Sequence, residues 1–487
     1  MAASNSHNAA ILTPPGMGHM IPSLELAKRL VTHQIVPKVT IFLASIKTSV
    51  PSKAETQLLQ SATNDNLFQI IHLPPLDMTN LVGPDATIET QVAAITHELP
   101  PLFLSAISTT EHNPTILIID QVLSNILPLV ENLKVPKFIF VSSNAWLLAL
   151  SLHTPILDKE LQGEYTDQSE PISIPGCKSV HPDDVFQLLR DRTHKVYREY
   201  LSTCEGLALA DAILVNTFNE LEPKTLAALS SGKVTKVPVY PVGLIVREEI
   251  RRQDGSDVFE WLDKQEEESV VYISLGSGYR MSQEQIKEMA LGLELSGQRF
   301  VWSLRTHAAT KAGDAIANYF TAGKETQAET GGGVSKSEEL NSLPDEFYRI
   351  QTRGMVITDW APQLDILKHP SVGGFVSHCG WNSVMESVSC GVPIVGWPLY
   401  AEQGMNAAML AEEIGIAVRL ELPLSTNVVG REDLAKAIRK VMDKEDEEGC
   451  EMRKKVKELK EAAKRAWSED GSSYLALSRI SQANGAL

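Results

Sequence analysis

Short apolar runs rich in β-branched residues alternate with stretches of helical periodicity along the first half of the chain. Such runs are typical of strands that are buried on both faces of a parallel sheet. Between the first two runs, Ile21–Val31 places Ile21, Leu24 and Leu30 on one apolar face, as in an amphipathic helix. The alternation predicts an α/β fold with a doubly wound sheet. The strands expected here are Ala9–Leu12, Lys38–Leu43, Gln69–Leu73, Thr115–Ile119, Phe138–Val141 and Ala212–Asn216.

The same alternation restarts after residue 268 and predicts a second α/β domain. Near its start, Ser282 followed by Gln285 has the spacing of a capping box at a helix N-terminus. The strands expected in this half are Ser269–Ser274, Phe300–Leu304, Met355–Thr358, Gly374–Ser377, Val392–Trp397 and Ile416–Leu420.

Two stretches do not follow the alternation. Val237–Asp257 opens with Pro238 and Pro241 and becomes rich in charges of both signs, which is typical of a linker. Thr306–Ser342 is poor in aromatic residues and predicts a mobile insertion, because it cannot bury enough apolar surface to offset the entropy of ordering. The predicted organisation is a first domain at 1–245, a linker at 246–258, a second domain at 259–465 with an insertion at 306–342, and a C-terminal helical segment at 466–487 that packs on the first domain.

Composition narrows the classes of function. The 487 residues include 44 Lys and Arg against 61 Asp and Glu, a net charge of −17, which disfavours nucleic acid and anionic membranes as partners. Five cysteines without a C-x-x-C pair predict neither a disulfide framework nor a zinc module. The N-terminus lacks the pattern of a signal peptide, and no apolar stretch reaches the ~20 residues of a membrane span. We therefore expect a cytoplasmic protein without a transmembrane segment.

Two polar residues follow or close predicted strands of the first domain. His19 comes after the first strand in the turn Pro14–His19, and Asp120 closes the strand Thr115–Ile119. Open α/β sheets bind ligands at the carboxyl ends of their strands, so both side chains are expected at one edge. A neutral imidazole paired with a carboxylate is typical of a general base. An Asp in this position also suits the cap of the next helix, and both interpretations stay open.

A phosphate site is predicted in the second domain. The run Ser377–Ser383 follows a predicted strand and opens a predicted helix, whose first N–H groups can bind an anion. Gly380 permits close approach of the ligand, and His378, Asn382 and Ser383 add side-chain donors.

Two more positions extend this site. Glu386 lies one helical turn beyond Asn382 and Ser383, where a carboxylate can accept hydrogen bonds from ribose hydroxyls. Ser277 follows another predicted strand and could contact the same phosphates. The sequence has no P-loop pattern, which argues against the γ-phosphate of a nucleoside triphosphate as the target. It has no Asp-x-Asp pair either, so we expect no bound metal.

Other enzyme classes are disfavoured by their missing patterns. Gly16-x-Gly18 is followed by Ile21 where a dinucleotide fingerprint has its third glycine, and the second strand ends without an acidic residue for an NAD ribose. The nucleophile-elbow pattern G-x-S-x-G of the α/β-hydrolases is absent from the sequence.

The run Trp360–Gln403 strongly resembles the signature of the plant family-1 UDP-glycosyltransferases. It reads WAPQLDILKHPSVGGFVSHCGWNS at its start and contains GVP and WPLYAEQ toward its end. The resemblance implies the GT-B fold, in which two Rossmann-like domains face each other across a cleft. It also implies that the first domain mainly binds the acceptor and the second binds the UDP-sugar, with inversion of the anomeric centre in one displacement.

The resemblance implies a role for each matching residue. His19 is the base and Asp120 its partner. The donor residues are Trp360 stacking on uracil, the Ala361 backbone and Gln363 completing nucleoside recognition, Glu386 on the ribose, Ser277, His378, Asn382 and Ser383 on the diphosphate, and Trp381, Glu402 and Gln403 on the sugar. Gln403 at the end of the signature implies glucose rather than galactose.

Further motifs resemble the phenol, hydroquinone and monolignol glucosyltransferases of the family: Pro15–His19, Val215–Pro223 and Val239–Gly243. They imply a small planar acceptor of the indoxyl, hydroquinone or monolignol type. The residues expected to contact it are Val122 and Trp146 in apolar loops, Tyr319 in the insertion, and Glu89 as a polar contact.

The predicted function is therefore a UDP-glucosyltransferase that acts as a monomer. Its ligands are UDP-glucose as co-substrate and a small aromatic acceptor, without a further cofactor or metal. Two alternatives remain: a nucleotide-sugar-binding protein without catalysis, which the pairing of His19 and Asp120 disfavours, and an NAD-dependent oxidoreductase, which the missing ribose carboxylate disfavours.

Overall fold

The computed structural model describes residues 8–46, 56, 59–60, 67–82, 88–110, 114–247, 257–276, 279, 281–304, 344–358, 360–420 and 428–482. These residues form two compact units. Unit 1 contains the described residues of 8–247 and 462–482, and unit 2 contains those of 257–461. The predicted insertion at 306–342 and most of the predicted linker at 246–258 lie outside the described residues, so the domain boundaries stay a prediction.

Unit 1 is built on a seven-stranded parallel sheet with the strand order β3-β2-β1-β4-β5-β6-β7. Its strands are β1 Asn8–Thr13, β2 Lys38–Leu43, β3 Gln69–His72, β4 Ile116–Asp120, β5 Lys137–Val141, β6 Ala212–Val215 and β7 Val239–Pro241. The strand order changes direction at β1. This strand pairs with β2 on one side and with β4 on the other. This is the doubly wound arrangement that the alternating pattern predicts.

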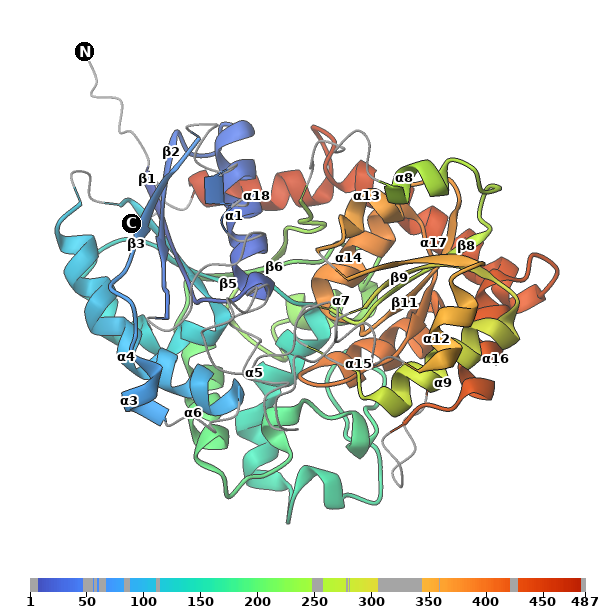
Figure 1. Ribbon diagram of the computed structural model, residues 1–487. Helices are drawn as coiled ribbons and strands as arrows, with labels where there is room; N and C mark the ends of the chain where they lie inside the picture. Colours follow the sequence, from blue (N-terminus) through green and yellow to red (C-terminus); the bar gives the residue numbers. More distant parts are fainter. Residues whose placement is uncertain are drawn as a thin grey trace. The chain divides into compact units, whose positions relative to one another are not determined.

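Helices cover the sheet of unit 1 (Figure 1). They are α1 Met17–Thr32, α3 Met78–Val82, α4 Ile88–Ser108, α5 Ala145–Glu160, α6 Lys195–Leu207, α7 Pro223–Ser230 and α18 Ser472–Gln482. The 3₁₀ segments are Gln121–Val130, Tyr165–Asp167, Pro182–Asp184 and Gln187–Leu189.

Alternate residues of the strands enter different layers of the core. Ile41 of β2 belongs to a buried cluster that also contains residues of α1 and α18, such as Leu30 and Leu477. The neighbouring Phe42 instead contacts Phe103 of α4 edge to face, with ring centroids 5.1 Å apart. Because both faces of its second half are buried, β2 ends in the continuous apolar run Ile41–Leu43 rather than in an alternating pattern.

Every strand predicted from the sequence is present, but β7 (Val239–Pro241) was missed. Two prolines in Val237–Asp257 favoured a linker there, whereas the structure pairs β7 with β6 at the edge of the sheet. Pro241 is the last residue of this edge strand, where a residue without an N–H is tolerated.

The C-terminal segment of unit 1 packs on α1. The indole Nε1 of Trp467 donates to the carbonyl of Leu244 at 3.1 Å. The guanidinium carbon of Arg29 lies 3.8 Å from the centre of the Trp467 ring system, and His33 stacks on the same ring system. Trp467 follows the charged helix α17 (Glu447–Ala466), whose last residues, 462–466, belong to unit 1.

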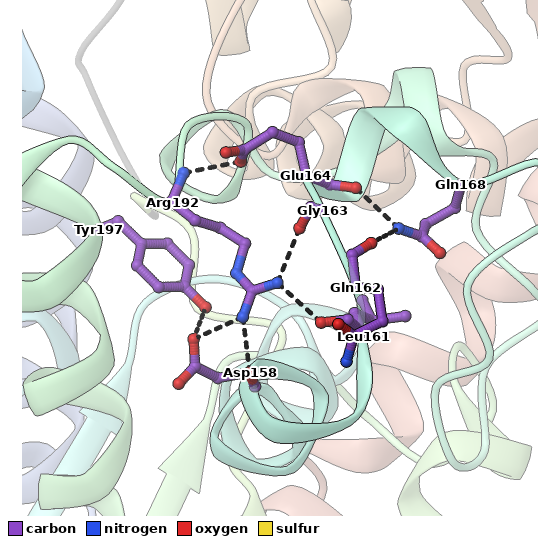
Figure 2. Close-up of polar contacts among 8 residues, drawn as sticks. All are labelled: Asp158, Leu161, Gln162, Gly163, Glu164, Gln168, Arg192 and Tyr197. Carbon is purple, nitrogen blue, oxygen red and sulfur yellow. Dashed lines mark hydrogen bonds and ion pairs between the residues drawn. The ribbon is translucent and has the colours of Figure 1, made fainter.

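Arg192 fixes the chain where α5 ends (Figure 2). Its guanidinium donates to the carbonyls of Asp158, Leu161 and Gly163 at 2.6, 2.9 and 2.7 Å. It also bonds the Asp158 carboxylate, which accepts from the hydroxyl of Tyr197 at 2.6 Å. These hydrogen bonds, with that of Tyr197 the largest cause, hold the pKa of Asp158 below its usual value. The cluster ties the C-terminal end of α5 to the start of α6.

Unit 2 is built on a six-stranded parallel sheet with the order β10-β9-β8-β11-β12-β13. Its strands are β8 Val270–Ser274, β9 Arg299–Ser303, β10 Gly354–Ile357, β11 Val372–Ser377, β12 Ile394–Gly396 and β13 Ala417–Arg419. Its helices are α8 Asp257–Leu262, α9 Gln283–Ser296, α12 Asp345–Ile350, α13 Gln363–Leu367, α14 Trp381–Cys390, α15 Gln403–Ala408, the π-helical Met409–Ile414, α16 Arg431–Met442 and the greater part of α17.

Close packing in unit 2 depends on small residues and on polar side chains that bond the backbone. A Cβ added to Gly374 of β11 would lie 2.8 Å from Sδ of Met442, so glycine allows α16 to approach the sheet. Ser282 caps α9, as predicted. The predicted capping box is only half present, because the side chain of Gln285 bonds both backbone groups of Val429 instead.

Among the helices in the described parts of the chain, none has both the length and the hydropathy of a membrane span.

Candidate functional site

Three neighbouring strands of unit 1 bring an imidazole, a carboxylate and a hydroxyl together. His19 lies in the first turn of α1, just after β1, while Asp120 ends β4 and Ser142 follows β5. Nδ1 of His19 is 2.9 Å from Oδ2 of Asp120 and 3.2 Å from Oγ of Ser142. The side chain of His19 is 19% exposed and that of Asp120 is 0% exposed, so the carboxylate is buried behind an accessible ring. The predicted neighbourhood of His19 and Asp120 is present.

Both oxygens of Asp120 are bonded. Oδ2 faces Nδ1 of His19, and Oδ1 accepts from the backbone N–H of Val122 at 3.1 Å. The two interpretations of this Asp are therefore compatible. One oxygen caps the segment Gln121–Val130, and the other contacts the histidine. Since an ionised carboxylate only accepts, Nδ1 carries the ring proton and Nε2 keeps its lone pair. That is the tautomer of a general base.

Helix α1 begins at Met17, four residues before the helix start expected from the sequence. Gly16, with φ of 107°, precedes the helix and accepts from the backbone N–H of His19 at 3.1 Å. The early start was missed because Gly16 and Gly18 are poor helix formers. It places His19 within the helix instead of in a loop, which restricts the positions of its ring.

The start of α5, next to Ser142, is capped twice. Asn144 accepts from the backbone N–H of Leu147 at 2.8 Å. Glu222 accepts from the backbone N–H groups of Ala145 and Trp146 at 3.0 and 3.1 Å. Sequence reasoning missed both Ser142 and Glu222. The sequence holds only a weak signal for each: Ser142 follows a predicted strand, and Glu222 lies in the motif Val215–Pro223.

In unit 2, His378 occupies a slot between two glycines at the ends of β8 and β11. A Cβ on Gly276 or Gly380 would lie 2.7 or 2.5 Å from Nε2 of this ring, so neither position has room for a side chain. Nδ1 is buried and has no hydrogen-bond partner among the described residues. Burial lowers the pKa of His378 to about 4, so the ring is neutral at physiological pH. It lies just before α14, whose N-terminus is the predicted phosphate site.

Three of the predicted nucleoside and phosphate residues contact one another. Nε2 of Gln363, the first residue of α13, donates to Oε2 of Glu386 at 2.6 Å and to Oγ of Ser383 at 2.9 Å. Glu386 and Ser383 lie three residues apart on one face of α14, as the spacing predicts. The structure thus gathers an amide, a hydroxyl and a carboxylate beside this helix N-terminus.

The remaining donor residues differ in exposure. The side chain of Trp360 is a large apolar group that is 40% exposed, whereas Ala361 is 8% and Trp381 4% exposed. Trp381 opens α14 and Asn382 follows it, so their backbone N–H groups lie in the helix's first turn. Glu402 directly precedes α15.

Gln403 is 3% exposed, and its Oε1 accepts from the backbone N–H groups of Leu399 and Tyr400 at 3.0 and 3.1 Å. These two bonds fix which end of the amide faces the backbone.

The predicted acceptor residues are only partly described. Neither Val122 nor Trp146 lies in a loop as expected. Val122 is partly exposed in the 3₁₀ segment Gln121–Val130. Trp146 lies in the first turn of α5, where it is 2% exposed and its indole Nε1 has no hydrogen-bond partner among the described residues. Glu89 lies in the first turn of α4, but its side chain is outside the described part of the chain. Tyr319 and the donor residue Ser277 also lie outside it. Within the described residues, no group of three or more His, Cys, Asp or Glu side chains is arranged to hold a metal ion.

Comparisons with known proteins identify the class. The profile of the family described as UDP-glucoronosyl and UDP-glucosyl transferase matches residues 246–454. Anthocyanidin 3-O-glucosyltransferase 5 of Manihot esculenta is 43% identical and covers 96% of this chain and 94% of its own. UDP-glycosyltransferase 72D1 of Arabidopsis thaliana is 42% identical and covers 96% of this chain and 97% of its own. The hydroquinone glucosyltransferase of Rauvolfia serpentina is 38% identical and covers 97% of this chain and 96% of its own.

Solved structures agree. TcCGT1 in complex with UDP is 38% identical, covers 99% of this chain and 100% of its own, and superposes with a TM-score of 0.86. A Polygonum tinctorium UDP-glucosyltransferase capable of glucosylating indoxyl, bound to 3,4-dichloroaniline, is 32% identical over 99% of both chains with a TM-score of 0.84.

The chain therefore belongs to the plant family-1 UDP-glycosyltransferases. It is a glycosyltransferase that uses a UDP-sugar as co-substrate, and it has the Rossmann-like α/β units of the GT-B class. The resemblance of the signature is confirmed, and an NAD-dependent oxidoreductase is ruled out.

The slot of His378 predicts a dependence of stability on pH. Between pH about 6.5 and about 4 the unfolded chain protonates this histidine while the folded chain does not, so lowering the pH through this window destabilises the fold by up to about 3 kcal/mol. His378→Gln should lose less stability than the wild type between pH 7 and pH 5 in urea unfolding monitored by tryptophan fluorescence. His97→Gln, at an exposed histidine, is the control. Parallel losses in wild type and His378→Gln would contradict the neutral, buried ring.

Proposed function

We propose that this enzyme is an inverting glucosyltransferase that moves glucose from UDP-glucose to the hydroxyl of a small planar phenol-like acceptor. The product is a β-D-glucoside. The observation that carries the proposal is the 2.9 Å contact between Nδ1 of His19 and Oδ2 of Asp120, because it leaves Nε2 as the basic atom of an accessible ring.

His19 acts on the acceptor in this mechanism. The acceptor oxygen loses its proton to Nε2 and forms a bond to C1 of glucose, while the bond between C1 and UDP breaks on the opposite side. The single displacement inverts the anomeric centre. The resulting imidazolium is stabilised by the carboxylate of Asp120. General-base help of this kind contributes about 10²–10⁴-fold in rate, or roughly 2.7–5.5 kcal/mol.

Unit 2 binds the donor in this proposal. The N-terminus of α14, with Asn382, Ser383 and the neutral imidazole of His378, supplies hydrogen bonds to the diphosphate and stabilises the departing UDP. Ser277 is assigned to the same phosphates from the sequence alone.

Three observations support the nucleoside assignment. The exposed Trp360 offers a face for stacking on uracil. Gln363 and the nearby Ala361 backbone are assigned to nucleoside recognition. The hydrogen bond from Gln363 to Glu386 places Gln363 beside the carboxylate assigned to the ribose. Trp360 and Ala361 lie just before α13, whose first residue is Gln363, so the three assigned residues are close together in the chain.

The sugar is assigned to Trp381, Glu402 and Gln403. Because Oε1 of Gln403 accepts from two backbone N–H groups, the amide is held in one orientation. A fixed amide suits selection among sugars that differ in the direction of one hydroxyl, which supports glucose as the donor sugar.

The acceptor is assigned to the indoxyl, hydroquinone or monolignol type. The relatives include a hydroquinone glucosyltransferase and an enzyme capable of glucosylating indoxyl. An acidic hydroxyl favours proton transfer to a neutral imidazole, whereas an aliphatic alcohol loses several pKa units of driving force. Val122, Trp146, Glu89 and Tyr319 are all assigned to the acceptor from the sequence, and we propose indoxyl as one of the substrates.

A UDP-release assay with UDP-glucose tests the function. Indoxyl, hydroquinone and a monolignol should each be converted far faster than an aliphatic alcohol, with a β-glucoside seen by mass and proton NMR. EDTA should leave the rates largely unchanged, since the proposed mechanism uses hydrogen-bond donors in place of a metal. An α-glucoside, or a strict requirement for Mg²⁺, would contradict the mechanism, and a poor rate with indoxyl alone would remove only that substrate.

His19→Ala should lower kcat with a simple phenol by at least about 10²-fold, because the base is lost. The Kd for UDP, from isothermal calorimetry, should change little, since the imidazole acts on the acceptor. Asp120→Asn should reduce kcat less, because the amide oxygen can still orient the ring. The exposed His97→Ala serves as the control and should keep full activity. If His19→Ala keeps near-normal turnover at neutral pH, His19 is not the base.

Gln403→His tests the sugar assignment. Losing a hydrogen bond that orients glucose costs about 1–3 kcal/mol, so kcat/KM for UDP-glucose should fall about 5- to 150-fold. The preference for UDP-glucose over UDP-galactose, compared under identical conditions, should narrow or reverse. Equal use of both donors by the wild type would argue against the assignment.

A further inference from the structure

We propose that Ser142 is a positioning residue for the base, and that Glu222 and Asn144 hold Ser142 in place through the start of α5. The inference rests on the proposed role of His19 and concerns what keeps its ring in a productive orientation.

The geometry at Nδ1 of His19 has two acceptors for one proton. Oδ2 of Asp120 lies at 2.9 Å and Oγ of Ser142 at 3.2 Å. Since Asp120 accepts the N–H, the hydroxyl oxygen of Ser142 is a second acceptor, and its own proton points elsewhere. With one acceptor the ring can still turn about the Nδ1 to Oδ2 line. The second acceptor, which comes from a different strand end, restricts that rotation and fixes the direction in which Nε2 points.

Ser142 itself has little freedom. It is 5% exposed and lies directly between the last residue of β5 and the capped start of α5. The carbonyl of Val141 accepts from the backbone N–H of Asn216 at 3.0 Å, which fixes the strand end. On the other side, Asn144 caps the helix through Leu147.

Glu222 strengthens this arrangement. Its carboxylate is 2% exposed and accepts from two N–H groups of the first turn of α5. Charge-assisted hydrogen bonds are stronger than those between neutral groups. At a helix N-terminus they also offset the free-energy cost of burying the carboxylate. Arg192 bonds the chain at the other end of α5 (Figure 2). Side-chain hydrogen bonds therefore hold both ends of the helix, with Glu222 at the start. This gives Glu222, the second of the two acidic residues in the motif Val215–Pro223, a role that the motif alone did not reveal.

The contribution of Ser142 should grow as the reaction proceeds. When Nε2 takes the acceptor proton, the ring becomes positive, and the oxygen of Ser142 next to Nδ1–H gains in interaction energy. A hydrogen bond to a charged group is stronger than one between neutral groups, so Ser142 stabilises the transition state more than the ground state.

The test compares two acceptors. One is a simple phenol, which is un-ionised at pH 7.5. The other is a nitrated or polychlorinated phenol, which is largely ionised at that pH and needs no base. Ser142→Ala should lower kcat for the simple phenol about 3- to 30-fold, a loss that spans the ranges expected for a neutral hydrogen bond and for one to a charged group, and leave the ionised acceptor within about 2-fold. KM for UDP-glucose should stay unchanged.

Ser151→Ala is the matched control. Ser151 lies on α5, is 6% exposed and donates to the carbonyl of Leu147, so the substitution removes a buried hydroxyl of the same helix away from His19. It should leave both acceptors unaffected. Equal losses of Ser142→Ala with both acceptors would mean a structural role, and no loss with the simple phenol would mean no role. Either result overturns the proposal.

Two further variants separate the inference from the function on which it rests. Glu222→Gln keeps the shape of the side chain but replaces one accepting oxygen with a donor, so it should show the same acceptor-dependent loss as Ser142→Ala. His19→Ala should show that dependence more strongly. If His19→Ala shows no dependence on acceptor ionisation, the base assignment itself fails. If it shows the dependence and Ser142→Ala does not, only the present inference fails.

Discussion

The buried carboxylate of Asp120 connects the fold of unit 1 with its chemistry. One oxygen accepts from the backbone of Val122 and starts the segment Gln121–Val130, and the other accepts from His19. A carboxylate with no exposed surface requires partners for both oxygens, because an unpaired buried charge is costly. Asp120, the proposed partner of the base, is therefore also a residue that the local fold requires, because the carboxylate that contacts the His19 imidazole also caps the segment after β4.

Parallel strand order explains why distant residues meet. β4 lies between β1 and β5, so polar residues at or just after their carboxyl ends, His19, Asp120 and Ser142, become neighbours although they are far apart in sequence. Unit 2 follows the same rule with β8 and β11, whose ends bring Gly276 against His378. In each unit the sheet interior provides stability, and the residues proposed for catalysis and donor binding lie where the strands stop.

The sequence predicts the features that depend on local pattern. The buried strands, the ends of β1 and β4, and the spacing of Ser383 and Glu386 on α14 are all readable from it. It does not predict partners that come from remote turns. The pairing of β7 with β6, the bonds from Gln285 to Val429, and the cap that Glu222 places on α5 join positions whose meeting is fixed only by the packed fold. Ser142 was overlooked for a different reason, since serine after a strand is common and carries little signal by itself.

The discontinuous composition of unit 1 has a consequence for biosynthesis. Its core includes Ala476, Leu477 and Ile480 of α18, which are made after all of unit 2. While the chain is being synthesised, the apolar cluster that contains Leu24 and Leu30 of α1 therefore lacks the residues that α18 contributes. Exposed apolar surface of this kind is where partly folded chains aggregate. Helix α1 also carries His19, the proposed base, so the same late step completes the apolar core on which this helix packs.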